Sequence, residues 1–184
     1  MQGNTTSKAY SLTQIALMAA VLCILGPLSI PVGPVPVSLQ NMVIFLTLYV
    51  LGMKKGTAAY LIYFLLGAVG FPVFAGFSGG IQKVLGPTGG FLVGFIPMAV
   101  IAGLVIDRWW DKPVISTIGM YLSTLVPSLT GTLWYAFTAG VGIKTAVTVT
   151  VLPFLVTDLI KIAAVSLLGA ALRRKLKAAG LFSE

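Results

Sequence analysis

Residues 147–172 read VTVTVLPFLVTDLIKIAAVSLLGAAL, an apolar stretch whose only charged side chains are Asp158 and Lys161. A helix needs roughly 20 apolar residues to cross the hydrocarbon core of a bilayer, so this stretch is long enough to span a membrane. Comparable apolar runs recur along the chain. The sequence therefore predicts an integral membrane protein built from transmembrane helices.

The composition of the whole chain supports this prediction. Of its 184 residues, 58% are hydrophobic and 9% are charged, and the mean hydropathy is +1.03, whereas soluble domains carry about 25% charged residues. A single transmembrane domain over residues 1–184 would use the full length. The sequence has no histidine and one cysteine, Cys23, so it lacks the usual general base and zinc ligands. We expect neither an enzyme nor a metal or cofactor site.

Prolines and glycines divide the chain into six predicted spans. Prolines at 27, 31, 34 and 36 separate the first two spans, and a glycine-rich segment follows the third. That segment contains too much glycine for a helix to be expected. We therefore predict an all-α bundle of six transmembrane helices with a long glycine-rich loop between the third and fourth. The predicted spans cover residues 11–30, 40–52, 56–70, 90–106, 114–140 and 147–172.

The positions of the positive charges predict the orientation in the membrane. Cytoplasmic loops carry an excess of Lys and Arg, and the net charge of +8 is scattered between the apolar runs rather than gathered as in a nucleic-acid binder. Six crossings place only Lys83 and Lys144 on one side, with Lys161 inside a span. We expect both termini to be cytoplasmic, because the other positive residues fall on their side: Lys8, Lys54, Lys55, Arg108, Lys112, Arg173, Arg174, Lys175 and Lys177.

Asp158 and Lys161 are the strongest candidates for a functional site. A charge at the centre of a membrane helix costs about 2.5 to 3.5 kcal/mol on insertion scales, and a spacing of three places both side chains on one helix face. They could bind a polar ligand inside the bundle, with Asp158 accepting from N–H donors and Lys161 donating to a carbonyl or carboxylate. The alternative is an ion pair that only locks this helix in place.

The segment 70–90 is the second candidate. It joins several glycines to Phe71, Phe74 and Phe77, with Gln82 after them. Glycines permit close backbone approach to a ligand and phenyl rings provide apolar walls, so the segment could cover a pocket as a lid. An ordinary surface loop is the alternative. The chain contains no G-x-x-x-x-G-K-[ST] pattern, which forms the phosphate-binding loop of many ATPases. It therefore does not itself carry an ATP site of that kind.

Small residues spaced four apart predict close helix contacts. Gly90 and Gly94 begin the fourth span, and Ala16 and Ala20 lie on the first. Such faces let helices approach closely. On spacing alone, Ala16 and Ala20 fit equally well with docking of another protein and with packing inside the bundle.

Three segments carry a resemblance to a known family. PVPVSLQ at residues 34–40, GFPVFAG at 70–76 continuing to GPTGGF at 86–91, and the D-x-x-K formed by Asp158 and Lys161 occur in this order over almost the whole chain. Together they resemble the BioY family, the biotin-specific S components of energy-coupling factor (ECF) transporters. Two positions depart from the family pattern: Phe91 stands where tyrosine is common, and Phe77 where a smaller residue is expected.

The resemblance implies a multi-pass protein of the bacterial cytoplasmic membrane that captures biotin for uptake. It also implies association with a transmembrane coupling subunit, docked on Ala16 and Ala20, and with two cytosolic ATPase subunits. The end of biotin that Asp158 and Lys161 would hold stays open. The residues expected to bind the ligand are Gln40, Phe74, Gly79, Gly80, Gln82, Asp158 and Lys161.

Two other functions compete with this interpretation. A self-sufficient ion-coupled carrier would use Asp158 as a titrating group. An intramembrane enzyme would need a nucleophile with its base, or a metal cluster, and the sequence offers no candidate for either.

Overall fold

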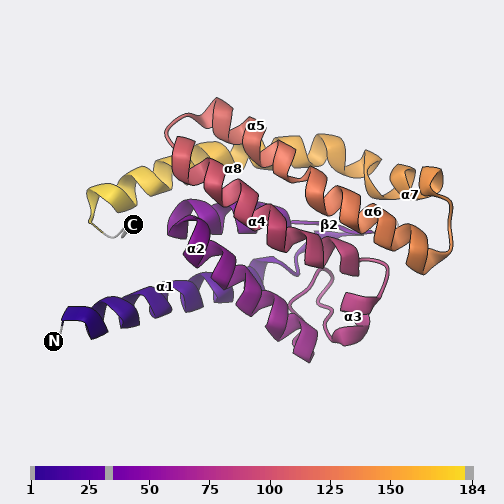
Figure 1. Ribbon diagram of the computed structural model, residues 1–184, viewed down its shortest axis with the longest axis horizontal. Helices are drawn as coiled ribbons and strands as arrows, with labels where there is room; N and C mark the ends of the chain where they lie inside the picture. Colours follow the sequence, from indigo (N-terminus) through magenta and orange to yellow (C-terminus); the bar gives the residue numbers. More distant parts are fainter. Residues whose placement is uncertain (1–2, 32–34, 181–184) are drawn as a thin grey trace.

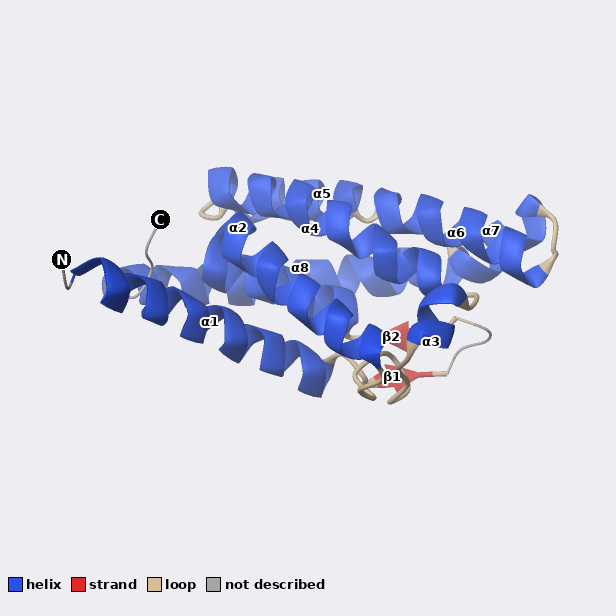
Figure 2. Cartoon of the chain, turned by 60° about the horizontal axis from the view of Figure 1, so that its bottom comes forward, coloured by secondary structure: helices blue, strands red, loops and turns tan. Residues whose placement is uncertain are grey.

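The computed structural model describes residues 3–31 and 35–180, and this part of the chain is mainly helical. Pro34, in the first segment that carries the family resemblance, lies outside it. Most long helices run along the length of the molecule, with the start of α1 and the end of α8 at one end and the hairpin, α3 and α7 toward the other (Figures 1 and 2). The elements are α1 (Gly3–Leu25), β1 (Ser29–Ile30), β2 (Val37–Ser38), α2 (Gln40–Val69), α3 (Ile81–Leu85), α4 (Gly89–Trp109), α5 (Pro113–Ser123), α6 (Leu125–Ala139), α7 (Ile143–Thr150) and α8 (Leu152–Ala178).

Helix α2 reverses direction at Gly52. This residue has φ 76° and ψ 176°, a conformation that glycine adopts readily. A Cβ atom on Gly56 would lie 3.2 Å from the Cα of Leu48, whereas residues eight apart in a straight helix are about 12 Å apart along the axis. The arm 53–69 therefore folds back on the arm 40–51.

The structure contains five to six apolar helical segments suited to a membrane. Five helical stretches of the described chain are long and apolar enough to cross: Lys8–Leu25, Gln40–Val69, Gly89–Trp109, Pro113–Ala139 and Ile143–Ala178. Large apolar side chains such as Leu17, Leu65 and Leu104 are exposed along the helices. A soluble monomer rarely exposes so much apolar surface, whereas in a bilayer it contacts lipid.

The structure differs from the predicted spans where prolines intervene. Helix α1 ends at Leu25, just before Pro27, and residues 29–30 instead form a short antiparallel hairpin with residues 37–38. The predicted span 114–140 is divided into α5 and α6 at Thr124, and 147–172 into α7 and α8 at Val151. Pro127 and Pro153 follow these breaks and cannot donate the backbone hydrogen bond that a continuous helix requires.

The segment between α2 and α4 also differs from its prediction. One helical turn, α3, forms within it, although the glycine content predicted none. The indole Nε1 of Trp134 on α6 donates to the carbonyl of Gly86 at 2.9 Å, just after α3 ends. The hydroxyl of Tyr63 on α2 donates to the carbonyl of Val73 at 2.8 Å. Both ends of the segment are therefore fastened to neighbouring helices.

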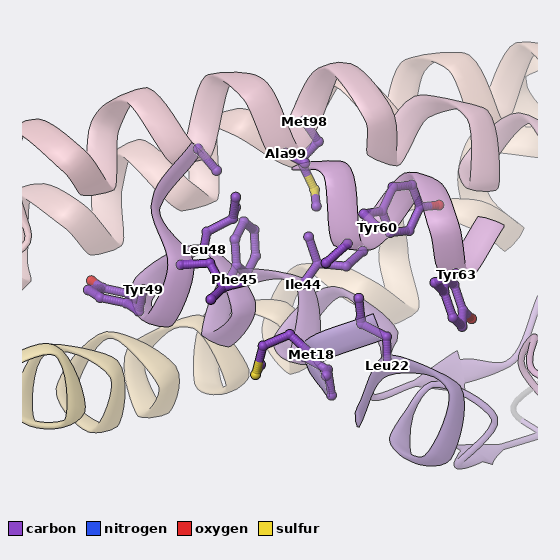
Figure 3. Close-up of a cluster of buried hydrophobic side chains, with 14 of the residues drawn as sticks. Met18, Leu22, Ile44, Phe45, Leu48, Tyr49, Tyr60, Tyr63, Met98 and Ala99 are labelled. Carbon is purple, nitrogen blue, oxygen red and sulfur yellow. The ribbon is translucent and has the colours of Figure 1, made fainter. Parts of the chain in front are cut away.

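The hydrophobic core lies between α1, α2, α4, α5 and α8. Figure 3 shows Met18 and Leu22 of α1 facing Ile44 and Phe45 of α2, with Met98 of α4 beyond them. Helix α4 also approaches α6 closely, because a Cβ atom on Gly94 would lie 2.7 Å from the Cα of Pro127. The predicted close contact at the start of α4 is thus confirmed.

A charged junction joins three helices at the end of the molecule where α1 begins and α8 ends. Asp107 on α4 accepts a hydrogen bond from the guanidinium of Arg173 on α8 at 2.8 Å and another from the backbone N–H of Met53 at 2.9 Å. The Arg173 side chain is only 4% exposed, and the Trp110 ring lies 5.8 Å from its Cζ. The reversal at Gly52 is thereby fixed to the ends of α4 and α8.

Replacing Asp107 with alanine should destabilise the fold. The change removes a charge-assisted hydrogen bond from the buried guanidinium and another from Met53, so we expect a loss of about 1.5 to 3 kcal/mol of unfolding free energy. Thermal unfolding in detergent measures it. Asp111→Ala is the matched control, because Asp111 lies nearby and is exposed. Equal melting temperatures for the two variants would show that the junction does not stabilise the fold.

Candidate functional site

A cavity opens toward the end of the bundle that carries the hairpin and α3. Its wall includes residues from the hairpin strand, the first turn of α2, the segment between α2 and α4, and helices α3, α4, α6, α7 and α8. Much of the wall is apolar, and the rings of Phe74, Phe91, Phe95 and Phe154 line it. Ligand pockets usually combine apolar walls with a few convergent polar groups. The charged groups in this wall are Lys83, Asp158 and Lys161.

Asp158 and Lys161 form the centre of a polar network in the cavity. The Oδ1 atom of Asp158 accepts from the side-chain amide of Asn41 at 2.9 Å and from the ammonium of Lys161 at 3.4 Å. Lys161 also donates to the carbonyl of Ser38 at 2.8 Å. The two charged side chains are 13% and 14% exposed. The network thus joins α8 to α2 and to the hairpin.

The local sequence explains this arrangement. Asp158 and Lys161 lie three residues apart on α8, so both side chains lie on the same face. Asn41 lies in the first turn of α2, and its Oδ1 accepts from the backbone N–H of Met42 at 2.9 Å. This bond turns the NH₂ group of Asn41 toward Asp158. The hairpin ends at Ser38, directly before α2, and so brings a main-chain carbonyl to Lys161.

The network leaves hydrogen-bonding capacity for a ligand. A carboxylate has two oxygens that accept hydrogen bonds, and among the described residues the bonds to Asp158 all involve Oδ1. Its Oδ2 therefore remains to accept from an N–H donor in the cavity. The Asn41 amide and the Lys161 ammonium can each donate to a ligand oxygen close by. The site suits a small molecule with adjacent N–H and C=O groups and an apolar body.

Four of the predicted site residues line the cavity: Gln40, Phe74, Asp158 and Lys161. Gln40 and Phe74 are almost fully buried, at 2% and 0% exposure. Their positions fit the expected wall, with Phe74 packed against the rings of Tyr63 and Phe64.

Three other predicted residues, Gly79, Gly80 and Gln82, lie outside the cavity wall. Gln82 is exposed. A Cβ atom on Gly79 would lie 2.1 Å from the carbonyl oxygen of Phe71, and the N–H of Gly80 donates to the carbonyl of Gly67 at 2.7 Å. Gly79 therefore packs the segment against itself, Gly80 bonds it to α2, and neither glycine lies in the wall of this cavity.

Of the three phenylalanines expected to line the pocket, two lie outside the cavity wall. Phe71 and Phe77 are 55% and 64% exposed, whereas Phe74 faces inward. Phe77 has φ 54°, which costs energy for a bulky residue. This strain gives a physical reason for the smaller residue expected at position 77.

Sequence reasoning missed Asn41, Ser38 and Lys83. Asn41 follows Gln40 at the start of an apolar span, where a polar residue is usually explained as a helix end. Ser38 takes part through its main-chain carbonyl. Every residue has this group, so the sequence gives no signal for the contact. Lys83 follows Gln82 in the segment expected to cover a pocket, but it was not named among the residues expected to bind the ligand, although its side chain lines the cavity.

Comparisons with known proteins place the chain in one family. The family model described as the BioY family matches residues 1–178. The chain is 39% identical over 170 residues to "Biotin transporter BioY2" of Lactococcus lactis subsp. cremoris, covering 92% of this chain and 93% of that protein. It is 38% identical to "Biotin transporter BioY" of Thermotoga maritima, covering 89% and 95%. The crystal structure of the S-component for biotin from an ECF-type ABC transporter matches with a TM-score of 0.83 at 30% identity, covering 95% of each chain.

Replacing Lys161 with methionine should destabilise the ligand-free protein. The change leaves the Ser38 carbonyl and the Asp158 carboxylate without their cationic donor, and hydrogen bonds to charged groups contribute about 1.5 to 3 kcal/mol each. We expect a lower melting temperature in detergent for Lys161→Met and a smaller change for Lys161→Arg. Lys144→Met, at an exposed position outside the cavity wall, should melt like the unmodified chain. If Lys161→Met also melts unchanged, the network does not hold the hairpin against α8.

Proposed function

Because the chain belongs to the BioY family, we propose that it is the biotin-capturing S component of an ECF transporter. The observation that carries the proposal is the Asn41–Asp158–Lys161 network, which lies inside an apolar cavity of a chain similar to biotin transporters over nearly its full length. The chain itself does no chemistry on its cargo. It binds the vitamin within the membrane and passes it on.

The ureido group of biotin complements this network. It presents two N–H donors and one carbonyl acceptor, so Asp158 accepts from an N–H while Asn41 or Lys161 donates to the carbonyl. The apolar bicycle and the aliphatic tail lie against the phenylalanine side of the wall. Because the Asp158 carboxylate is already held by Asn41, it need not reorganise when the ligand arrives, and such preorganisation favours tight binding.

The chain crosses the membrane six times in this proposal, counting the two arms of α2 separately, with both termini in the cytoplasm. Two observations support this topology. The start of α1 and the end of α8 lie at the same end of the molecule (Figure 1). The Asp107–Arg173 junction and the basic end of α8 lie there too, and basic residues mark the cytoplasmic side. The cavity would then face the outer side, where biotin arrives.

A transmembrane coupling subunit docks on α1 through Ala16 and Ala20, and two cytosolic ATPase subunits supply the energy. The placement of these alanines supports docking over internal packing, because both are exposed whereas Met18 and Leu22 on the same helix lie in the core. Small exposed residues four apart allow a partner helix to approach closely. The sequence lacks the ATP-binding loop pattern described above, so a separate ATPase is required.

A self-sufficient ion-coupled carrier is not favoured. The relatives of the chain are biotin transporters, and the matching structure is an S component. Asp158 is held by a cation and an amide, which suits a permanent role as an acceptor. Biotin uptake by proteoliposomes that contain this chain alone and require only a proton or sodium gradient would support the carrier instead.

Replacing Asp158 with asparagine should abolish tight biotin binding. The change removes the charged acceptor, and loss of one partner of a buried charged hydrogen bond costs about 2 to 5 kcal/mol, roughly 30-fold or more in affinity. Isothermal titration of the detergent-purified protein measures this, with thiamine and riboflavin as ligands that should not bind. Asp111→Asn is the matched control for loss of a negative charge.

Two results would contradict the proposal in different ways. Unchanged biotin affinity in Asp158→Asn would remove Asp158 from the site while leaving the family function intact. Absence of biotin binding by the well-folded, unmodified chain would contradict the function itself.

A further inference from the structure

The charges in the cavity wall do not balance. Asp158 and Lys161 are paired with each other at 3.4 Å, and Lys161 is also committed to the Ser38 carbonyl. Lys83 is the remaining charged side chain among the described residues of the wall. One positive charge is therefore left for the cavity to neutralise.

The Lys83 side chain is available to a ligand. It is partly exposed, and among the described residues its ammonium has no hydrogen bond or ion pair. It lies on α3, which packs against α2 and α4, whereas Asp158 and Lys161 lie on α8. Lys83 thus reaches the cavity from a different wall from the Asp158 network.

We propose that Lys83 binds the carboxylate of the cargo and so selects a ligand whose tail ends in a free acid. This inference rests on the proposed function and assigns the end of biotin that the Asp158 network leaves open. Biotin has a neutral ureido group at one end and a carboxylate at the other. With the ureido group on Asp158 and Asn41, the acid pairs with the one cation that the network does not use.

An ammonium–carboxylate pair is a charge-assisted hydrogen bond, which is roughly twice as strong as one between neutral groups. An amide or ester of biotin keeps the ureido group and the bicycle but carries no negative charge. The site would therefore discriminate free biotin from biotin whose carboxylate has been converted to a neutral amide or ester. Binding of the acid would also link α3 to α8 through the ligand, fastening the segment between α2 and α4 over the cavity.

The test compares biotin with biotinamide on the detergent-purified unmodified chain and three variants by isothermal titration at low salt. The unmodified chain should bind biotin about tenfold or more tightly than biotinamide. Lys83→Gln should bind biotinamide unchanged but lose the preference for biotin, and Lys83→Arg should retain it. Lys144→Gln, which removes an exposed lysine outside the wall, should behave as the unmodified chain.

A charge reversal provides an independent check on the same pair. Lys83→Glu should bind biotinamide more tightly than biotin, because the introduced carboxylate repels the acid. The inference is overturned if the unmodified chain binds both ligands equally, if Lys83→Gln keeps the preference, or if Lys83→Gln weakens both ligands to the same extent. In each of these results biotin still binds the unmodified chain, so they differ from a failure of the proposed function, in which it does not bind at all.

Discussion

The structure depends on a charged network that must be satisfied inside an apolar bundle. An aspartate within a membrane helix is costly unless it is paired, and Asp158 is paired because α2 brings Asn41 and α8 itself brings Lys161 to its Oδ1 atom. Lys161 in turn requires a carbonyl, which the hairpin supplies at Ser38. The start of α2, the hairpin and the middle of α8 are therefore held in one arrangement. The cavity is the space that this arrangement leaves beside the phenylalanines.

Hydropathy could predict much of the fold, because the need to bury apolar residues in lipid is a property of each segment alone. The turn near Gly52 was visible as a basic pair, Lys54 and Lys55, after an apolar run. What hydropathy could not predict were features that depend on contacts between segments. The hairpin needs two strands to meet, and the segment that contains α3 is held at its two ends by Trp134 and Tyr63 from other helices. The breaks near Thr124 and Val151 had a local signal in Pro127 and Pro153, which hydropathy conceals.

The candidate site was predictable from the sequence where a side chain is energetically costly to place in an apolar helix. Asp158 and Lys161 stand out because charges in an apolar run demand an explanation, whereas an asparagine at a helix start or a lysine in a loop has an ordinary one. Asn41 and Lys83 became visible only when the fold placed them in one cavity. The glycine-rich segment shows the opposite case. Its small residues suggested ligand contact, and in this structure Gly79 packs the segment against itself while Gly80 bonds it to α2.

The bond from Lys161 to Ser38 ends on a main-chain carbonyl, and this affects how the contact can change during evolution. A substitution at position 38 alters a side chain but leaves the carbonyl in place, so the contact survives drift in the hairpin sequence. An inserted or deleted residue beside it would instead shift the carbonyl out of reach. This contact therefore constrains the spacing between the hairpin and Asn41 more strongly than the side chain at position 38, whose hydroxyl accepts a separate bond from the N–H of Gln40 at 3.4 Å. A genetic screen for loss of the contact would therefore return substitutions at codon 161 and in-frame insertions or deletions beside the hairpin. It would rarely return substitutions at codon 38.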